Sequence, residues 1–258
     1  MKKLYVCIIS VMLMISFVVP VYSLNLNEGY FNDRLLLKKN EKILDIDILE
    51  NRAKNGIHDA PRHVVENIAE NTVLSIDDEI QLEAPLLTTE LLSVSIDNNN
   101  NINKEYATTA ISDLYVTSSG VVTRRETATE EHESEYGEIK LITTIYYDLG
   151  TYDGIDYISL TKVYTYAIAL EPRMQVEHVK ARYGYAGYNL ETGRASSHTS
   201  GWFTNRDTSY TISSINCPLL EHTSGGVYYS VWGEGFAYFS RDSWTSSASH
   251  QVHCSGWG

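Results

Sequence analysis

Basic residues are scarce in this chain, and their shortage excludes two classes of function. Lys and Arg number 20 against 33 Asp and Glu, so the formal net charge is −13. Because a strongly acidic surface repels phosphate backbones and anionic lipid head groups, this balance argues against nucleic-acid binding and against cationic disruption of membranes.

Long apolar runs are also missing, except at the N-terminus. Lys2 and Lys3 precede an apolar run over residues 4–19, and residues 20–23 read Pro-Val-Tyr-Ser. This order predicts a secretory signal peptide over residues 1–23 that is cut after Ser23. An uncleaved membrane anchor is the alternative, but the run is shorter than the roughly 20 apolar residues that span a bilayer. We therefore expect a secreted, extracellular protein with no transmembrane segment after signal removal.

Cysteines are few. Cys7 lies in the predicted signal peptide, which leaves Cys217 and Cys254 as one pair. Export to an oxidising compartment predicts a disulfide between them, which would tie the last strand to the body of the domain. Two free or metal-bound thiols are the competing interpretation.

Catalytic and cofactor motifs are absent as well. The chain has no zinc-protease helix motif, no Gly-flanked serine elbow, no phosphate-binding glycine loop and no dinucleotide fingerprint. The acidic run at 130–135 is typical of a solvated loop, with weak calcium binding as the alternative. His250 and His253 would point to opposite faces of a strand, which argues against a local metal site. We predict no catalytic residue, no cofactor and no metal.

The composition changes near residue 105. Residues 24–105 are acidic and poor in aromatics, and they close with the asparagines at 98–101. We expect a poorly structured or partly helical N-terminal segment that ends in a linker, and a pro-region is one interpretation of it. A helix is predicted from Ala60 to Asn71 with Asp59 as its cap. The stretch 44–48 fits a helix or a strand equally well.

Residues 106–258 are rich in Tyr, Thr, Val and Ser, which are typical of strands. Glycine-containing turn signals punctuate the candidate strands, among them Gly233-Glu234-Gly235. Many short strands without a helical pattern between them predict an all-β domain, an antiparallel β-sandwich of the jelly-roll or Ig-like kind.

Aromatic residues crowd the last part of the chain. In the pairs Tyr228-Tyr229 and Tyr146-Tyr147 one ring must face away from the core, because side chains alternate along a strand. Exposed aromatic platforms suit sugars or protein partners, and the candidate binding residues are Trp202, Tyr229, Trp232 and Trp244. The sequence favours a secreted, non-catalytic β-sandwich, as in many exported bacterial proteins, that binds a carbohydrate or a protein at a cell surface. The alternatives are a bacteriocin-like antagonist with a pro-region and an extracellular polysaccharide hydrolase.

Overall fold

A computed structural model describes residues 34–77, 79–80, 84–116, 122–124, 137–222 and 226–257. The predicted signal peptide and the acidic run at 130–135 lie outside these residues. The elements in chain order are β1 (Arg34–Lys39), α2 (Ile46–Lys54), α3 (Arg62–Asn71), β2 (Val73–Ile76), β3 (Glu79–Ile80), β4 (Leu86–Asp97), β5 (Ile102–Val116), β6 (Val122–Arg124), β7 (Gly137–Tyr152), β8 (Ile155–Ala169), β9 (Met174–Asn189), β10 (Arg194–Thr199), β11 (Phe203–Asn205), β12 (Ser209–Ile212), β13 (Leu220–Glu221), β14 (Tyr228–Arg241) and β15 (Trp244–Trp257).

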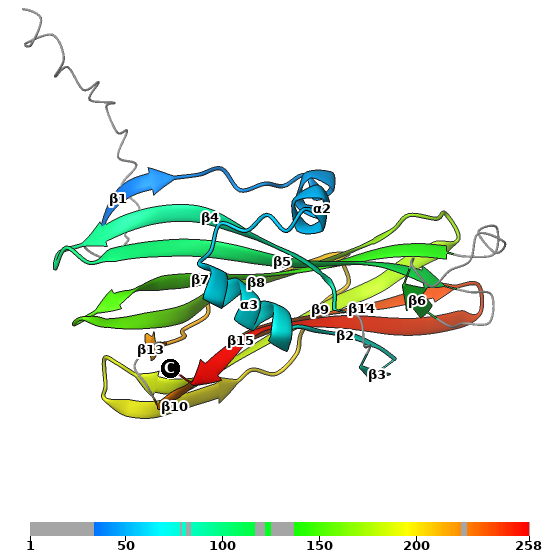
Figure 1. The fold of residues 1–258 in the computed structure, drawn as a ribbon. Coiled ribbons are helices and arrows are strands. Elements are labelled where there is room, and N and C mark those ends of the chain that lie inside the picture. Colours follow the sequence, from blue (N-terminus) through cyan, green and yellow to red (C-terminus); the bar gives the residue numbers. More distant parts are fainter. Residues whose placement is uncertain are drawn as a thin grey trace, which may run out of the picture. The chain divides into compact units, whose positions relative to one another are not determined.

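The predicted all-β antiparallel class is confirmed. The strands form one sheet in the order β1-β4-β5-β7-β8-β13-β9-β14-β15-β2-β3, and every pairing between described strands is antiparallel. Long neighbouring strands run side by side in Figure 1, first β4, β5, β7 and β8, then β9, β14 and β15. Neither helix among the described residues is long and apolar enough to cross a membrane.

The sheet folds back on itself, so that β14 and β15 pack against β5, β7 and β8. One cluster of buried side chains joins Ile145 and Val163 to Val231 and Val252. A second cluster contains Leu141, Phe239 and other residues of the same strands. Burial of these apolar faces is the main term that holds the two layers together.

Two glycines let the layers approach closely in the middle of β14. A Cβ on Gly233 would lie 2.6 Å from Cγ2 of Val163, and one on Gly235 would lie 2.3 Å from the hydroxyl oxygens of Thr143 and Thr165. The sequence predicted a turn at Gly233-Glu234-Gly235, and this prediction is wrong: these residues pair continuously with β9 and β15. A glycine inside a strand often marks such a close approach.

In the structure the asparagine run is the turn of the β4–β5 hairpin, whereas the sequence predicted a linker there. The Asp97 carboxylate accepts hydrogen bonds from the backbone N–H groups of Asn99 and Asn101, both at 2.9 Å. Asn100 has a φ of 63°, a left-handed conformation that asparagine tolerates. The boundary predicted between residues 105 and 106 falls inside β5, and the described residues on both sides of it belong to one compact unit.

Both helices belong to this unit. The predicted helix at 60–71 is confirmed as α3, but its N-cap is Pro61, and Asp59 instead accepts a hydrogen bond from the backbone N–H of Leu91. The ambiguous stretch at 44–48 begins α2, because the Asp45 carboxylate caps its first turn. Lys140 of β7 holds α2 to the sheet through an ion pair with Glu50.

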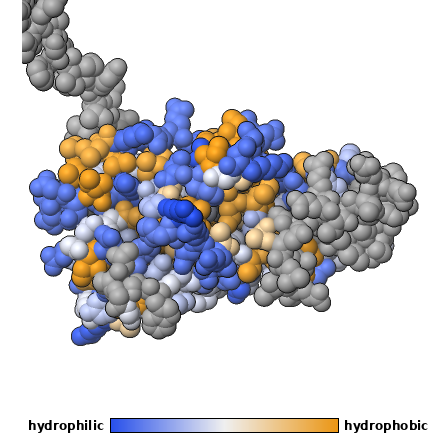
Figure 2. Space-filling model, viewed as in Figure 1, coloured by the Kyte–Doolittle hydropathy of each residue, from blue (hydrophilic) through white to orange (hydrophobic). Residues whose placement is uncertain are grey.

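The edge strand β1 is apolar but exposed. Leu35, Leu36 and Leu37 have exposed fractions of 57%, 39% and 54%. Figure 2 shows hydrophobic residues at this end of the molecule and beside α2, with hydrophilic residues between them. These leucines are therefore not part of the core.

Candidate functional site

Two of the four predicted binding residues, Trp202 and Trp232, meet over one side chain on the outer face of β9 and β14. The Arg182 guanidinium carbon lies 4.4 Å from the ring centroid of Trp202 and 5.7 Å from that of Trp232. Trp202 also meets Phe236 edge-on, with ring centroids 5.8 Å apart. The indole of Trp202 remains 40% exposed.

The register between β14 and β9 builds a row of aromatic and basic side chains. Opposite residues are Trp232 and Gly184, Glu234 and Arg182, Phe236 and Lys180, and Tyr238 and His178. Side chains directly opposite in an antiparallel pair share one face of the sheet, so this row is continuous. We call it the aromatic strip, and it consists of Trp202, Trp232, Phe236 and Tyr238 with the facing Arg182, Lys180 and His178.

Each aromatic ring of β14 rests on its partner from β9. The indole of Trp232 lies against Gly184, where an added Cβ would come within 2.5 Å of the ring. Lys180 Nζ lies 5.3 Å from the Phe236 centroid, and His178 stacks on Tyr238 at 5.3 Å. From Trp232 to Phe236 the strip spans about 13 Å, since an antiparallel strand rises about 3.4 Å per residue.

The charges in the strip are only partly paired. Glu234 Oε2 accepts a hydrogen bond from Arg182 Nε at 2.6 Å and forms an ion pair with Nη2 of the same guanidinium at 2.6 Å. Lys180 has no carboxylate within ion-pair distance among the described residues. Burial, followed by the charge of Lys180, lowers the pKa of His178, while Glu177 opposes this effect. The strip thus offers one fixed ion pair and one free ammonium group.

A polar row from β15 borders the aromatic strip. His253, Gln251 and Ser249 stand opposite Trp232, Glu234 and Phe236. His253 Nε2 is 2.8 Å from the Ser230 hydroxyl, and burial lowers the pKa of this histidine. Hydroxyl, amide and imidazole groups therefore lie within one strand spacing of the rings.

Tyr229 and Trp244, the other two predicted binding residues, do not belong to this surface. Tyr229 is 6% exposed and faces the core, where its ring packs at 4.7 Å on His222. Its neighbour Tyr228 is 41% exposed, as the alternation argument predicted. Trp244 lies at the β14–β15 hairpin and packs on Phe239 at 6.2 Å. The sequence did not separate these two residues from Trp202 and Trp232, because composition does not show which face a ring takes.

Cys217 and Cys254 do not form the predicted disulfide in the structure; both are free cysteines. Cys254 points from β15 into the core, and Cys217 lies in the segment before β13, where its Sγ donates a hydrogen bond to the Pro218 carbonyl at 3.5 Å. Burial raises the pKa of the Cys217 thiol to about 11 and that of Cys254 to about 12. Neither thiol is ionised at neutral pH, so neither is an activated nucleophile.

His250 and His253 face opposite sides of β15, as the strand period predicted. His250 is buried and shares a hydrogen bond of 2.9 Å with Ser112, whereas His253 lies on the outer face. In the part of the chain that the structure describes, no three His, Cys, Asp or Glu side chains cluster as metal ligands.

Sequence reasoning missed the residues that connect the two tryptophans. Arg182, Lys180, Glu234 and Phe236 are essential to the aromatic strip, yet no role was predicted for them. These residues occupy every second position of 178–184 and 232–238. That alternation indicates a shared surface only when the two strands are known to pair. Comparison with protein-family models, with curated proteins and with solved structures finds no match for this chain.

Proposed function

We propose that this is a secreted, non-catalytic protein that binds an extended carbohydrate chain along the aromatic strip. The observation that carries the proposal is the convergence of Trp202, Trp232 and Phe236 on one exposed sheet face. Binding sites for small polar molecules combine apolar and aromatic walls with a few fixed polar groups. Here the rings of β14 supply the walls, and the polar row of β15 supplies donors and acceptors for hydroxyl groups.

The chemistry of the strip favours binding over catalysis. Glu234, the carboxylate at its centre, is held by a hydrogen bond and an ion pair from Arg182. Glycoside hydrolysis uses two carboxyl groups that flank the scissile bond, whereas the Glu234 carboxylate is engaged in its ion pair with Arg182. The ion pair instead holds the Arg182 guanidinium against the Trp202 ring, with its carbon 4.4 Å from the ring centroid. The predicted signal peptide, with its basic, apolar and small-residue regions in the expected order, supports an extracellular place of action.

A glycan array with the purified mature protein tests this function. We expect binding to one class of linear glycan, and we expect Trp202→Ala to weaken that binding at least about tenfold, because truncated tryptophan hot spots cost about 2 kcal/mol or more. Phe203→Ala is the matched control. Phe203 is 38% exposed, similar to Trp202, but it stacks on Tyr183 and Tyr210 outside the strip.

Two results would count against the proposal. One is full glycan binding by the Trp202→Ala protein, and the other is an equal loss in the Phe203→Ala protein. Binding to whole cells that survives removal of surface glycans would point to a protein partner instead.

A further inference from the structure

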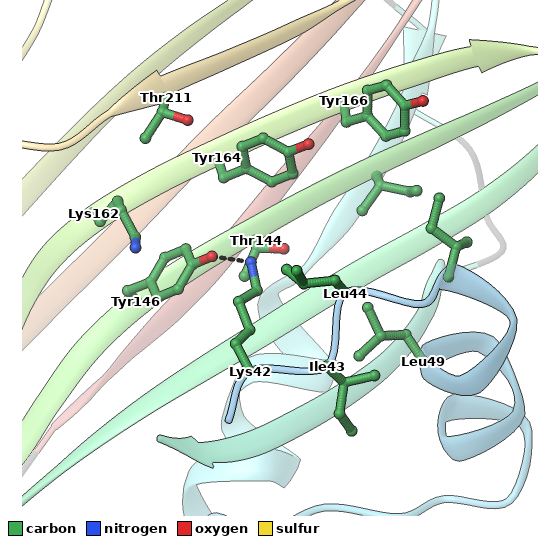
Figure 3. A pocket seen from close by; sticks show the side chains of 12 residues that line it. Lys42, Ile43, Leu44, Leu49, Thr144, Tyr146, Lys162, Tyr164, Tyr166 and Thr211 are labelled. Atoms are coloured by element: carbon green, nitrogen blue, oxygen red, sulfur yellow. Dashed lines mark hydrogen bonds between the residues drawn. The ribbon is translucent and has the colours of Figure 1, made fainter. Parts of the chain in front are cut away.

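A pocket lies on the opposite side of the molecule's core from the aromatic strip. It is a hollow of about 380 Å³ between the outer face of β7 and β8, the segment before α2, and Thr211 of β12. Figure 3 shows Tyr146, Tyr164 and Tyr166 standing on the two strands, with Lys42 reaching over them from the preceding segment. Its volume is within the range of small-molecule sites, about 300–1,000 Å³.

Two ammonium groups converge on one tyrosine in this pocket. Lys42 Nζ donates a hydrogen bond to the Tyr146 hydroxyl and lies 4.7 Å from the ring centroid. Lys162 Nζ lies 3.7 Å above the same ring. Burial, followed by the charge of Lys162, lowers the pKa of Lys42, while Glu90 opposes this effect.

The described part of the chain pairs no carboxylate directly with either ammonium group. Burial raises the pKa of Tyr146, so its hydroxyl stays protonated and contributes no negative charge. Neither lysine has a carboxylate of the described chain within 4.0 Å. Burial also raises the pKa of Glu90, whose Oε1 already accepts a hydrogen bond from the backbone N–H of Ile43 at 2.8 Å. In a chain of net charge −13, such an unpaired basic pair is a specific feature.

The other end of the pocket is apolar. Leu44, Leu49 and Ile142 line it, and Leu49 and Ile142 pack together at the base of α2. Tyr164 and Tyr166, with ring centroids 6.4 Å apart, form the wall between the basic and the apolar ends. A ligand that satisfies both ends has one anionic group and a compact apolar body.

We propose that this pocket binds a small organic carboxylate, with the carboxylate between Lys42 and Lys162 and the apolar body toward Leu44, Leu49 and Ile142. The two ammonium groups supply charge-assisted hydrogen bonds to the two oxygens. The tyrosine faces supply flat contact area for an aromatic or short aliphatic body. This site is separate from the aromatic strip and does not depend on the function proposed for it.

Calorimetric titration of the intact mature protein, from residue 24 onward, with phenylacetate tests whether the pocket binds a carboxylate. Phenylacetamide, which has the same shape without the charge, and inorganic phosphate, which has the charge without the apolar body, are the comparison ligands. We expect phenylacetate to bind at least tenfold more tightly than either. We expect Lys162→Met to weaken phenylacetate binding at least tenfold, since hydrogen bonds to charged groups are the stronger kind.

Lys104→Met is the control, because Lys104 is an exposed lysine of β5 that lines neither the pocket nor the aromatic strip. It should leave the phenylacetate affinity unchanged. Equal binding of phenylacetamide, preference for phosphate, or unchanged affinity in Lys162→Met would each overturn the proposal. If Lys162→Met fails to fold, Thr211→Trp provides the second test, because Thr211 is an exposed position of β12 from which the larger side chain would fill the pocket. This variant should abolish phenylacetate binding, and retained binding would refute the site.

Discussion

Replacing Lys140 by methionine is expected to lower the free energy of unfolding by about 3–5 kcal/mol, the cost of breaking a buried ion pair from one side. Lys140 is 9% exposed, and its ammonium group pairs with Glu50 of α2 and, at 3.1 Å, with Asp113 of β5. Methionine keeps the length of the side chain but leaves both carboxylates without this cation. Among the described residues, Glu50 would then retain Lys54 as its one ion-pair partner.

The same network predicts a pH dependence. Burial alone would raise the pKa of Glu50, but the hydrogen bonds from Lys140 and Lys54 lower it overall. A carboxyl whose folded pKa is lowered contributes stability above its unfolded pKa, and this contribution is lost on acidification below about 4.5. Lys140→Met should therefore lose part of the acid sensitivity of the native protein.

Urea unfolding of the wild type and the variant measures this effect. Lys104→Met, at an exposed position on the neighbouring strand β5, is the control and should change stability by less than about 0.5 kcal/mol. A loss below about 1 kcal/mol for Lys140→Met would show that α2 is not held by this network.

Gly235→Ala is expected to destabilise the protein by about 3 kcal/mol, although it adds a single methyl group. The new Cβ would lie 2.3 Å from the hydroxyl oxygens of both Thr143 and Thr165, which belong to the facing layer. Both threonines are fully buried, so the two layers would have to separate locally. Overpacking of this kind costs about 1–3 kcal/mol and occasionally more.

Gly201→Ala provides the matched control for that substitution. Gly201 has an ordinary φ, and nothing lies within 4 Å of the place that its new methyl group would take. Thermal unfolding should place Gly201→Ala close to the wild type and Gly235→Ala well below it. Similar melting temperatures for the two variants would contradict the close packing of β14 on β7 and β8.

Local sequence patterns predicted much of the fold. The Tyr, Thr and Val content after residue 106 indicated the strands, and the adjacency of Tyr228 and Tyr229 correctly required one exposed ring. The patterns were less informative about glycine, because Gly233 and Gly235 have the same local signature in a turn as in a crowded strand. The asparagines at 98–101 were ambiguous for the same reason. Turns and linkers are both rich in residues whose side chains hydrogen-bond to the nearby backbone.

The binding surfaces were harder to predict, because each is assembled from distant segments. Trp202, which precedes β11, and Trp232 of β14 both reach Arg182 because β11 and β14 pair with β9, and the sequence contains no direct signal of these pairings. Lys42 and Lys162 converge only because the segment before α2 crosses β7 and β8. Residue types therefore suggested an aromatic surface, but the strand register decides which rings belong to it.

Nuclear magnetic resonance of the tryptophan indoles is the most direct test of the aromatic strip. The chain has four tryptophans, at 202, 232, 244 and 257, so four indole N–H signals are expected from the full-length chain, and single substitutions assign them. On titration with a glycan identified by the array, we expect the Trp202 and Trp232 signals to shift together while that of Trp244 stays in place. Saturable glycan binding that leaves the Trp202 and Trp232 signals unmoved would contradict binding along the strip.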